Sequence, residues 1–278
     1  MIHIYPFHHR YVEARQAVAD HIGDGITADD VILCSGCSCS LDLCISAVAN
    51  PGDNILVPRP GFPLYTTLAK GLGITTKEYD LLPDKDWQVD LAHMESLIDL
   101  KTVAILVNNP SNPCGSVFDE DHLKAILEIA NRHCLPIIAD EIYEHFVFDK
   151  PYVSLASLST DVPVLSCGGL TKRYLVPGWR LGWITLHDRN GVLRDSGIRK
   201  GLHCLSQRII GANTLVQGAL PTILKETPKE FFSDTLDQIE TNAKLAFEKL
   251  SQVPGLRPVM PSGAMYMMVG IDRPGFSR

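Results

Sequence analysis

Val103-Ala-Ile-Leu-Val107 is an entirely apolar stretch, and a second such run, Pro136-Ile-Ile-Ala139, follows it. Between the two, apolar residues recur at the spacing of one helical face: Leu123, Ile126, Leu127 and Ala130. That spacing predicts a helix joining two short strands. Because strands that are apolar along their whole length are buried on both faces, the unit predicts an α/β fold with a mostly parallel sheet and helices on both sides.

The same alternation extends outward in both directions. Further strands are predicted at 31–34, 54–58, 162–167 and 181–186, and a helical stripe runs from Leu41 to Val48. The pattern from 198 to 250 is mostly helical, and strands are predicted again at 256–259 and 264–269. We expect a large α/β domain over residues 1–227 and the start of a smaller, incomplete α+β domain over residues 228–278.

Composition and charge narrow the classes of function. Of the 278 residues, 45% are hydrophobic and 21% are charged, which is typical of a globular protein. The formal net charge of −7 argues against general binding to nucleic acid or to anionic membranes. Apolar runs stay well below the roughly 18 residues of a membrane span, and the first residues lack a signal-peptide pattern. We therefore expect a cytoplasmic protein.

Eight cysteines raise the question of a metal site. Cys34, Cys37 and Cys39 form a CxxCxC cluster. A structural zinc site needs a second pair of ligands in similar array, and the sequence has no matching CxxC or HxxxH. We expect no metal, and in a reducing compartment these cysteines act as small hydrophobic residues.

Polar residues directly follow three of the predicted strands. They are Ser35-Gly36-Cys37-Ser38 after the first strand, Asn108 and Asn112 after the strand at 103–107, and Asp140 and Tyr143 after the strand at 136–139. Each group has a structural explanation of its own, as turn, helix cap or connecting loop. In an open parallel sheet, however, ligands lie beyond the carboxyl ends of the strands, so we expect one ligand to use them together.

A lysine and an arginine stand close together in Gly169-Leu-Thr-Lys172-Arg-Tyr-Leu-Val-Pro-Gly-Trp-Arg180-Leu-Gly182. An amine forms a Schiff base with an aldehyde, and a guanidinium binds two phosphate oxygens at once. A ligand that combines both groups is pyridoxal 5′-phosphate (PLP). The loop at 35–38 opens a helix, and its free N–H groups suit the phosphate. Two solvated charges beside a turn remain the alternative for Lys172 and Arg180.

The run from Ser166 to Trp183 resembles the cofactor-attachment motif of the class I aminotransferases, PLP enzymes of fold type I, and is closest to members that act on tyrosine. The resemblance extends from about Glu13 to Val269. It implies that Lys172 holds PLP and acts as general acid–base, and that Arg180 and the loop at 35–38 hold the phosphate. Asp140 would face the pyridine nitrogen and keep it protonated.

Further site residues follow from the same resemblance. Asn112 and Tyr143 would reach the O3′ oxygen of PLP, and the 28 positions between Asn112 and Asp140 equal the interval in the family. Asn108 matches a second asparagine of the family pattern. Phe62 matches the aromatic residue that stacks on the pyridine ring.

Two positions near the phosphate are less regular. Tyr5 matches a tyrosine that the family directs to the phosphate in the partner subunit. The family often carries a serine three residues before the lysine, and here that position is Gly169.

The resemblance implies a homodimer that transfers an amino group from tyrosine to 2-oxoglutarate, giving 4-hydroxyphenylpyruvate and glutamate. The alternatives are an alanine or kynurenine aminotransferase, a C–S lyase, and a truncated PLP-binding remnant without catalysis. Family members are longer at both ends, and their C-terminal part carries an arginine for the substrate carboxylate that Arg278 does not match. We therefore expect a truncated chain whose binding of the transition state is weakened by about 2–5 kcal/mol, the cost of losing one buried charge-assisted pair.

Overall fold

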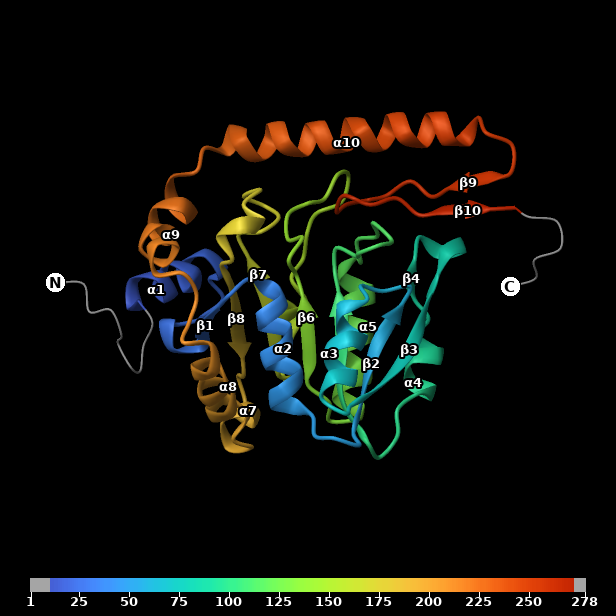
Figure 1. Ribbon diagram of the computed structural model, residues 1–278. Helices are drawn as coiled ribbons and strands as arrows, with labels where there is room; N and C mark the ends of the chain where they lie inside the picture. Colours follow the sequence, from blue (N-terminus) through green and yellow to red (C-terminus); the bar gives the residue numbers. More distant parts are fainter. Residues whose placement is uncertain (1–10, 273–278) are drawn as a thin grey trace.

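The computed structural model describes residues 11–272, and across them eight strands form one sheet in the order β1-β8-β7-β6-β5-β2-β3-β4 (Figure 1). The strands are β1 (Val31–Cys34), β2 (Asn54–Arg59), β3 (Thr75–Leu82), β4 (Gln88–Val89), β5 (Thr102–Asn108), β6 (Ile137–Asp140), β7 (Val164–Gly169) and β8 (Gly182–His187). Six of these match predicted strands within two residues. The strands β3 and β4 were not predicted. The first half of β3 is exposed or half-buried, and only Tyr79 and Leu81 within it are buried.

Strand direction confirms the mostly parallel sheet. The pairs β2–β3, β2–β5, β5–β6 and β6–β7 are parallel. Strand β8 is antiparallel to both β7 and β1, so β1 runs in the same direction as β7. The carboxyl ends of β1, β5, β6 and β7 therefore meet at one edge of the sheet.

Helices cover both faces of the sheet, as predicted (Figure 1). The helices are α1 (Val12–Ile22), α2 (Cys37–Val48), α3 (Leu64–Gly71), α4 (Leu91–Ser96), α5 (Glu120–Arg132), α6 (Leu155–Leu158), α7 (Val192–Asp195), α8 (Ile198–Ser206), α9 (Thr214–Glu226) and α10 (Lys229–Ser251). Successive strand residues point to opposite faces. Thus Leu106 packs in the core under α2, α3 and α8, whereas its neighbour Ile105 packs under α4, α5 and α6. Burial of each such side chain contributes about 1.5–3 kcal/mol to the stability of the fold.

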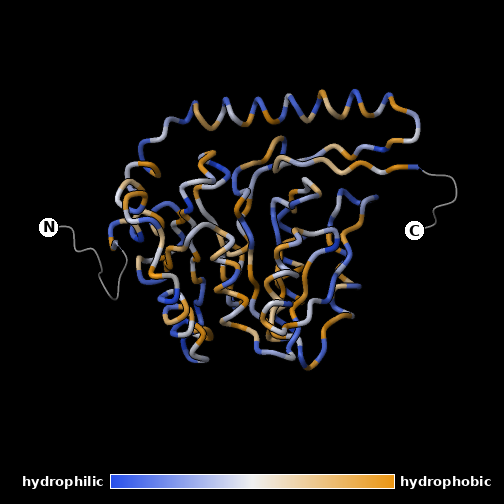
Figure 2. Tube along the Cα trace, viewed as in Figure 1, coloured by the Kyte–Doolittle hydropathy of each residue, from blue (hydrophilic) through white to orange (hydrophobic). Residues whose placement is uncertain are grey.

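Beyond α9 the chain forms the long helix α10 and the two-stranded sheet of β9 (Leu256–Pro258) and β10 (Val269–Ile271), which lie along the upper side of Figure 1. Hydrophilic and hydrophobic residues alternate along α10 (Figure 2). Its apolar stripe is half-buried along its length: Leu236, Ile239, Ala243, Ala246 and Leu250. The break between α9 and α10 falls at the predicted boundary, and the division into two domains stays a prediction.

The predicted strand at 264–269 is wrong for most of its length, because β10 begins only at Val269. Ala264 has a left-handed backbone, with φ of 56°, which a strand does not accommodate. Its N–H donates to the carbonyl of Phe146 at 2.9 Å, and the preceding Gly263 forms a bridge with Val147. This segment therefore pairs with the chain that follows β6 instead of extending β10.

His187, at the end of β8, is expected to make the fold less stable in acid. Its imidazole is buried, 3.2 Å from the hydroxyl of Thr185, and burial lowers its pKa from 6.5 to about 4, while the carboxylate of Asp24 acts in the opposite direction. Because the unfolded state binds the proton more tightly, the stability contributed by neutral His187 is present above pH 6.5 and is lost as pH falls towards 4. We expect the free energy of unfolding to fall by about 3 kcal/mol between pH 6.5 and pH 4.

Denaturant unfolding at pH 7.5 and pH 4.5 measures this loss. A His187→Gln variant keeps a polar group beside Thr185 and cannot titrate, so its stability is expected to fall by much less between the two pH values. Equal losses for both proteins would contradict the assignment to His187.

Candidate functional site

Four strand ends bring most of the predicted residues together. The loop at 35–38 follows β1, Asn108 ends β5, Asp140 ends β6, and Lys172 lies just beyond β7. Arg180 precedes β8, which starts at this same edge because it runs antiparallel. The sheet topology thus gathers an amine, a carboxylate and a guanidinium at the edge where open α/β sheets bind ligands.

Arg180 and the loop after β1 form one polar cradle. The guanidinium donates to the carbonyl of Ser35 at 3.1 Å and to the hydroxyl of Ser38 at 3.0 Å. Gly36 has φ of 77°, and a Cβ there would overlap the guanidinium of Arg180. Directly after Gly36, α2 begins at Cys37 with backbone N–H groups that the helix leaves unpaired. Positive charge and N–H donors at one helix start fit a phosphate.

Cys37 contributes to this cradle through its backbone. Its side chain points elsewhere, with Sγ 3.7 Å from Oδ1 of Asp140. The cysteine therefore connects the expected phosphate site with the expected ring-nitrogen site.

Asp140 is buried, with 3% of its surface exposed. Its Oδ2 accepts a hydrogen bond from the hydroxyl of Tyr65 at 2.7 Å, and its Oδ1 accepts from the N–H of Ile142 at 3.3 Å. Burial raises the pKa of Asp140, whereas Tyr65, Ile142, Cys37 and the charge of Lys172 act in the opposite direction. A buried carboxylate that still accepts donors is suited to stabilise a protonated ring nitrogen.

The side chain of Glu141 points to the opposite face of the sheet from that of Asp140, as expected for the next residue along an extended chain. Its carboxylate accepts from Ser166 at 2.6 Å, from Ser154 at 3.0 Å and from the N–H of Leu155 at 2.9 Å. These partners belong to the face that carries α6, so Glu141 stabilises the fold and lies away from the candidate site.

Both polar ends of the Asn108 amide are used within the protein. Its Nδ2 donates to the carbonyl of Asp140 at 3.0 Å, and its Oδ1 accepts from the N–H of Asn112 at 2.7 Å. Asn108 thus orients Asp140 and Asn112. Asn112 itself is half-buried. Its predicted contact with the O3′ oxygen of PLP stays a prediction.

Lys172 lies over Tyr143, with Nζ 5.3 Å from the centre of the ring. The Tyr143 hydroxyl lies 2.6 Å from that of Tyr266, a residue that our sequence reasoning did not assign to the site. Burial, followed by the hydrogen bond to Tyr266, raises the pKa of Tyr143, so its hydroxyl stays protonated. The Tyr143 ring therefore bounds the space around the Lys172 amine on one side.

Phe62 lies in the loop between β2 and α3 and is 37% exposed. Its ring meets that of Tyr65 edge to face, with 5.7 Å between the ring centres. Both rings line a groove of about 410 Å³, whose lining includes neither Lys172 nor Arg180. The predicted stacking of Phe62 on a pyridine ring stays a prediction.

Gly169 lies where β7 and β8 approach each other closely. A Cβ at this position would lie 2.8 Å from the carbonyl of Leu181 and 2.9 Å from the Cα of Gly182. A serine here would push two backbones apart. Tyr5 lies outside the described residues.

Tyr65 is the main residue that sequence reasoning missed. It stands in the apolar pattern of α3 and reads there as a core residue. Within residues 11–272, no three His, Cys, Asp or Glu side chains gather in an arrangement that could hold a metal ion.

Comparison with known proteins adds to this geometry. The sequence profile of the family Aminotransferase class I and II matches residues 1–276. Tyrosine aminotransferase of Mus musculus is 57% identical over 270 residues, which cover 96% of this chain and 59% of that protein. Its counterpart in Homo sapiens is 60% identical over 252 residues, which cover 90% of this chain and 55% of that protein. The chain therefore spans less than two thirds of the length of these relatives.

Solved structures have the same architecture. Alanine aminotransferase from Pyrococcus furiosus superposes with a TM-score of 0.91 at 33% identity, covering 95% of this chain and 68% of that one. Tyrosine aminotransferase from Leishmania infantum gives a TM-score of 0.87 at 34% identity, covering 91% of this chain and 64% of that one.

Proposed function

This chain belongs to the family of class I and II aminotransferases, and on that premise we propose that it binds PLP and transfers an amino group from tyrosine to 2-oxoglutarate. The products would be 4-hydroxyphenylpyruvate and glutamate. The observation that carries the proposal is the convergence of Lys172, Asp140 and Arg180 at one edge of the sheet. The identity of 57–60% to two tyrosine aminotransferases supports tyrosine as the amino donor.

The residues present suit each part of PLP. Arg180 and the N–H groups at the start of α2 would hold the phosphate. Asp140 would accept a hydrogen bond from the ring nitrogen, and Phe62 would cover one face of the ring. When bound, PLP supplies a conjugated ring that takes up the electrons left on the substrate when its α-carbon loses a proton.

Lys172 would act twice in this proposal. Its amine would attach PLP and, once released, would remove the proton from the α-carbon of the substrate and return it elsewhere on the same complex. The ring of Tyr143, 5.3 Å from Nζ, would restrict the amine to one side of the site. Asn108 would keep Asp140 and Asn112 in place through its two hydrogen bonds.

A homodimer and a cytoplasmic location belong to the same proposal. Among the helices of residues 11–272, none combines the length and the apolar character needed to cross a membrane. Gel filtration of the purified chain would test the dimer, and cell fractionation would test the location.

An alanine aminotransferase is the second candidate, supported by the TM-score of 0.91 to the Pyrococcus furiosus enzyme. A kynurenine aminotransferase would use the same cofactor residues. These candidates differ in how they recognise the substrate side chain, for which a pocket discriminates by about 10–200-fold per missing apolar group.

The substrate test compares kcat/KM for tyrosine, alanine and kynurenine with 2-oxoglutarate as acceptor. We expect the value for tyrosine to be at least about tenfold above that for alanine, because loss of the aromatic ring removes much apolar contact. We also expect it to exceed the value for kynurenine, whose ring is separated from the side-chain CH₂ group by a carbonyl. The ratio stays readable even if the overall rate is low. A higher value for alanine would overturn the choice of substrate, and PLP binding without any turnover would favour the non-catalytic remnant.

A further inference from the structure

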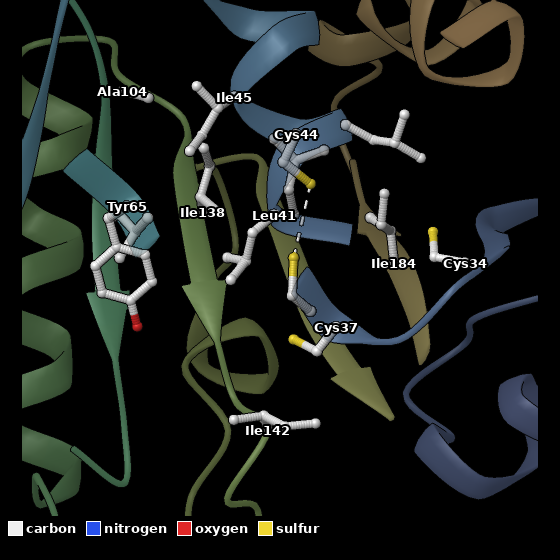
Figure 3. Close-up of a cluster of buried hydrophobic side chains, with 14 of the residues drawn as sticks. Cys34, Cys37, Leu41, Cys44, Ile45, Tyr65, Ala104, Ile138, Ile142 and Ile184 are labelled. Carbon is white, nitrogen blue, oxygen red and sulfur yellow. Dashed lines mark hydrogen bonds between the residues drawn. The ribbon is translucent and has the colours of Figure 1, made fainter. Parts of the chain in front are cut away.

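We propose that Tyr65, assisted by Cys37, is a positioning residue that keeps the carboxylate of Asp140 charged and oriented towards the ring nitrogen of PLP. This inference rests on the proposed function, because it takes Asp140 as the partner of PLP. Figure 3 shows Tyr65 and Cys37 on either side of β6, the strand that carries Ile138 and ends at Asp140. They come from two different helices, α3 and α2.

The need for such residues follows from the surroundings of Asp140. The carboxyl group contacts Tyr65 and Cys37, which belong to the same buried core cluster as Ile142. Removal from water favours the neutral carboxylic acid. A neutral acid would not balance the charge of a protonated pyridine, so donors to the charged form are required.

Tyr65 is suited to be the principal donor. Its hydroxyl lies 2.7 Å from Oδ2 of Asp140, and its side chain is 1% exposed. Burial, followed by the charge of Asp140, raises the pKa of Tyr65 well above its usual value, so the hydroxyl keeps its proton. Cys37 behaves in the same way, because burial and the same carboxylate raise the pKa of its thiol.

The distribution of donors over the two oxygens leaves room for one more. A carboxylate offers about four acceptor positions, two on each oxygen. The N–H of Ile142 and the thiol of Cys37 approach Oδ1, whereas Tyr65 donates to Oδ2. One position on Oδ2 remains for a single N–H donor, which is what a pyridinium ring presents.

Charged and titratable groups approach Asp140 from each element packed around it. They are Tyr65 on α3, Cys37 on α2, Cys167 on β7, Tyr143 after β6, and Lys172 beyond β7. Of these, Lys172 is the cation, and Tyr65 is first among the groups that favour the charged carboxylate. Removal of the Tyr65 hydroxyl alone should therefore shift the titration of Asp140 upwards.

Tyr79 provides a matched control. It is also a tyrosine 1% exposed in the core, and its hydroxyl donates to the carbonyl of Leu106 at 2.8 Å. Tyr79→Phe removes a buried hydroxyl of the same kind without touching Asp140.

The test is an infrared titration of the carboxyl band in the PLP-free chain, with the band of Asp140 identified by its loss in Asp140→Asn. We expect the midpoint in Tyr65→Phe to lie about one to two pH units above that of the unaltered chain, from the strength of a hydrogen bond to a charged group. Cys37→Ala should raise the titration midpoint of Asp140 by a smaller amount. Cys37→Ser, which keeps a donor at this position, should have the midpoint of the unaltered chain. Tyr79→Phe should leave it unchanged.

PLP affinity against pH provides the second readout. In Tyr65→Phe the decline of PLP affinity at low pH should begin at a higher pH, by the same one to two units. Below that new midpoint, PLP affinity should fall about tenfold for each pH unit. Ionisation of the phosphate affects all variants alike. Equal midpoints in Tyr65→Phe and Tyr79→Phe would overturn the inference. Failure of the unaltered chain to bind PLP would overturn the proposed function instead, while the infrared titration would still decide the role of Tyr65.

Discussion

Lys172→Ala is expected to abolish covalent attachment of PLP and to lower turnover by about 10⁴-fold or more, since one amine serves as both nucleophile and general acid–base. Borohydride reduction followed by mass spectrometry should find PLP on the peptide that contains Lys172 in the unaltered chain and not in the variant. The visible absorbance of protein-bound PLP should be lost at the same time.

Lys200, an exposed residue on α8, offers the matched control for this experiment. Lys200→Ala removes an equal charge at a distance from the strand ends and should keep both attachment and turnover. A Lys172→Ala chain that retained the reduced adduct would show that another amine holds PLP, and the central assignment would fail.

Asp140→Asn is expected to lower kcat by about 10²–10³-fold while PLP stays bound, because the amide has the shape of the carboxylate and lacks its charge. The lost interaction acts mainly in the transition state, when the ring takes up electrons. We therefore expect kcat and kcat/KM to fall together. Steady-state kinetics with PLP held at saturation would measure both.

Glu141→Gln distinguishes a change at the site from a change in the fold. Glu141 is as deeply buried as its neighbour, and it accepts three hydrogen bonds on the opposite face of the sheet. Its variant should lower the free energy of unfolding and leave kcat nearly unchanged. If both variants lowered kcat equally, the effect of Asp140→Asn would be one of folding.

Local pattern was sufficient for the layers and for most of the elements. Continuous apolar runs require burial on both faces, so the strands containing Ile105 and Ile138 could be placed in a parallel sheet without any contact information. The strand β3 escaped prediction because its exposed Thr75 and Glu78 give it no such run. The prediction of a strand at 264–269 was wrong because the backbone of Ala264 bonds to Phe146, which is distant in sequence.

The candidate site divides in the same way. Lys172, Arg180 and Asp140 could be named from the sequence, since their chemistry and spacing lie within short motifs at strand ends. Tyr65 could not, because the tyrosine reads as part of the apolar face of its helix, and its hydroxyl finds Asp140 across 75 residues of chain. The double use of the Asn108 amide also depends on the pairing of β5 with β6.

The sequence alone therefore determined the α/β class and the amine, carboxylate and guanidinium that meet at the sheet edge, because periodicity and motif spacing are properties of neighbouring residues. Only the tertiary structure decided which groups surround Asp140 and how closely the backbones approach at Gly169. Hydrogen bonds between distant elements and the close approach of two backbones arise only when the strands pack side by side, and local sequence carries no record of that geometry.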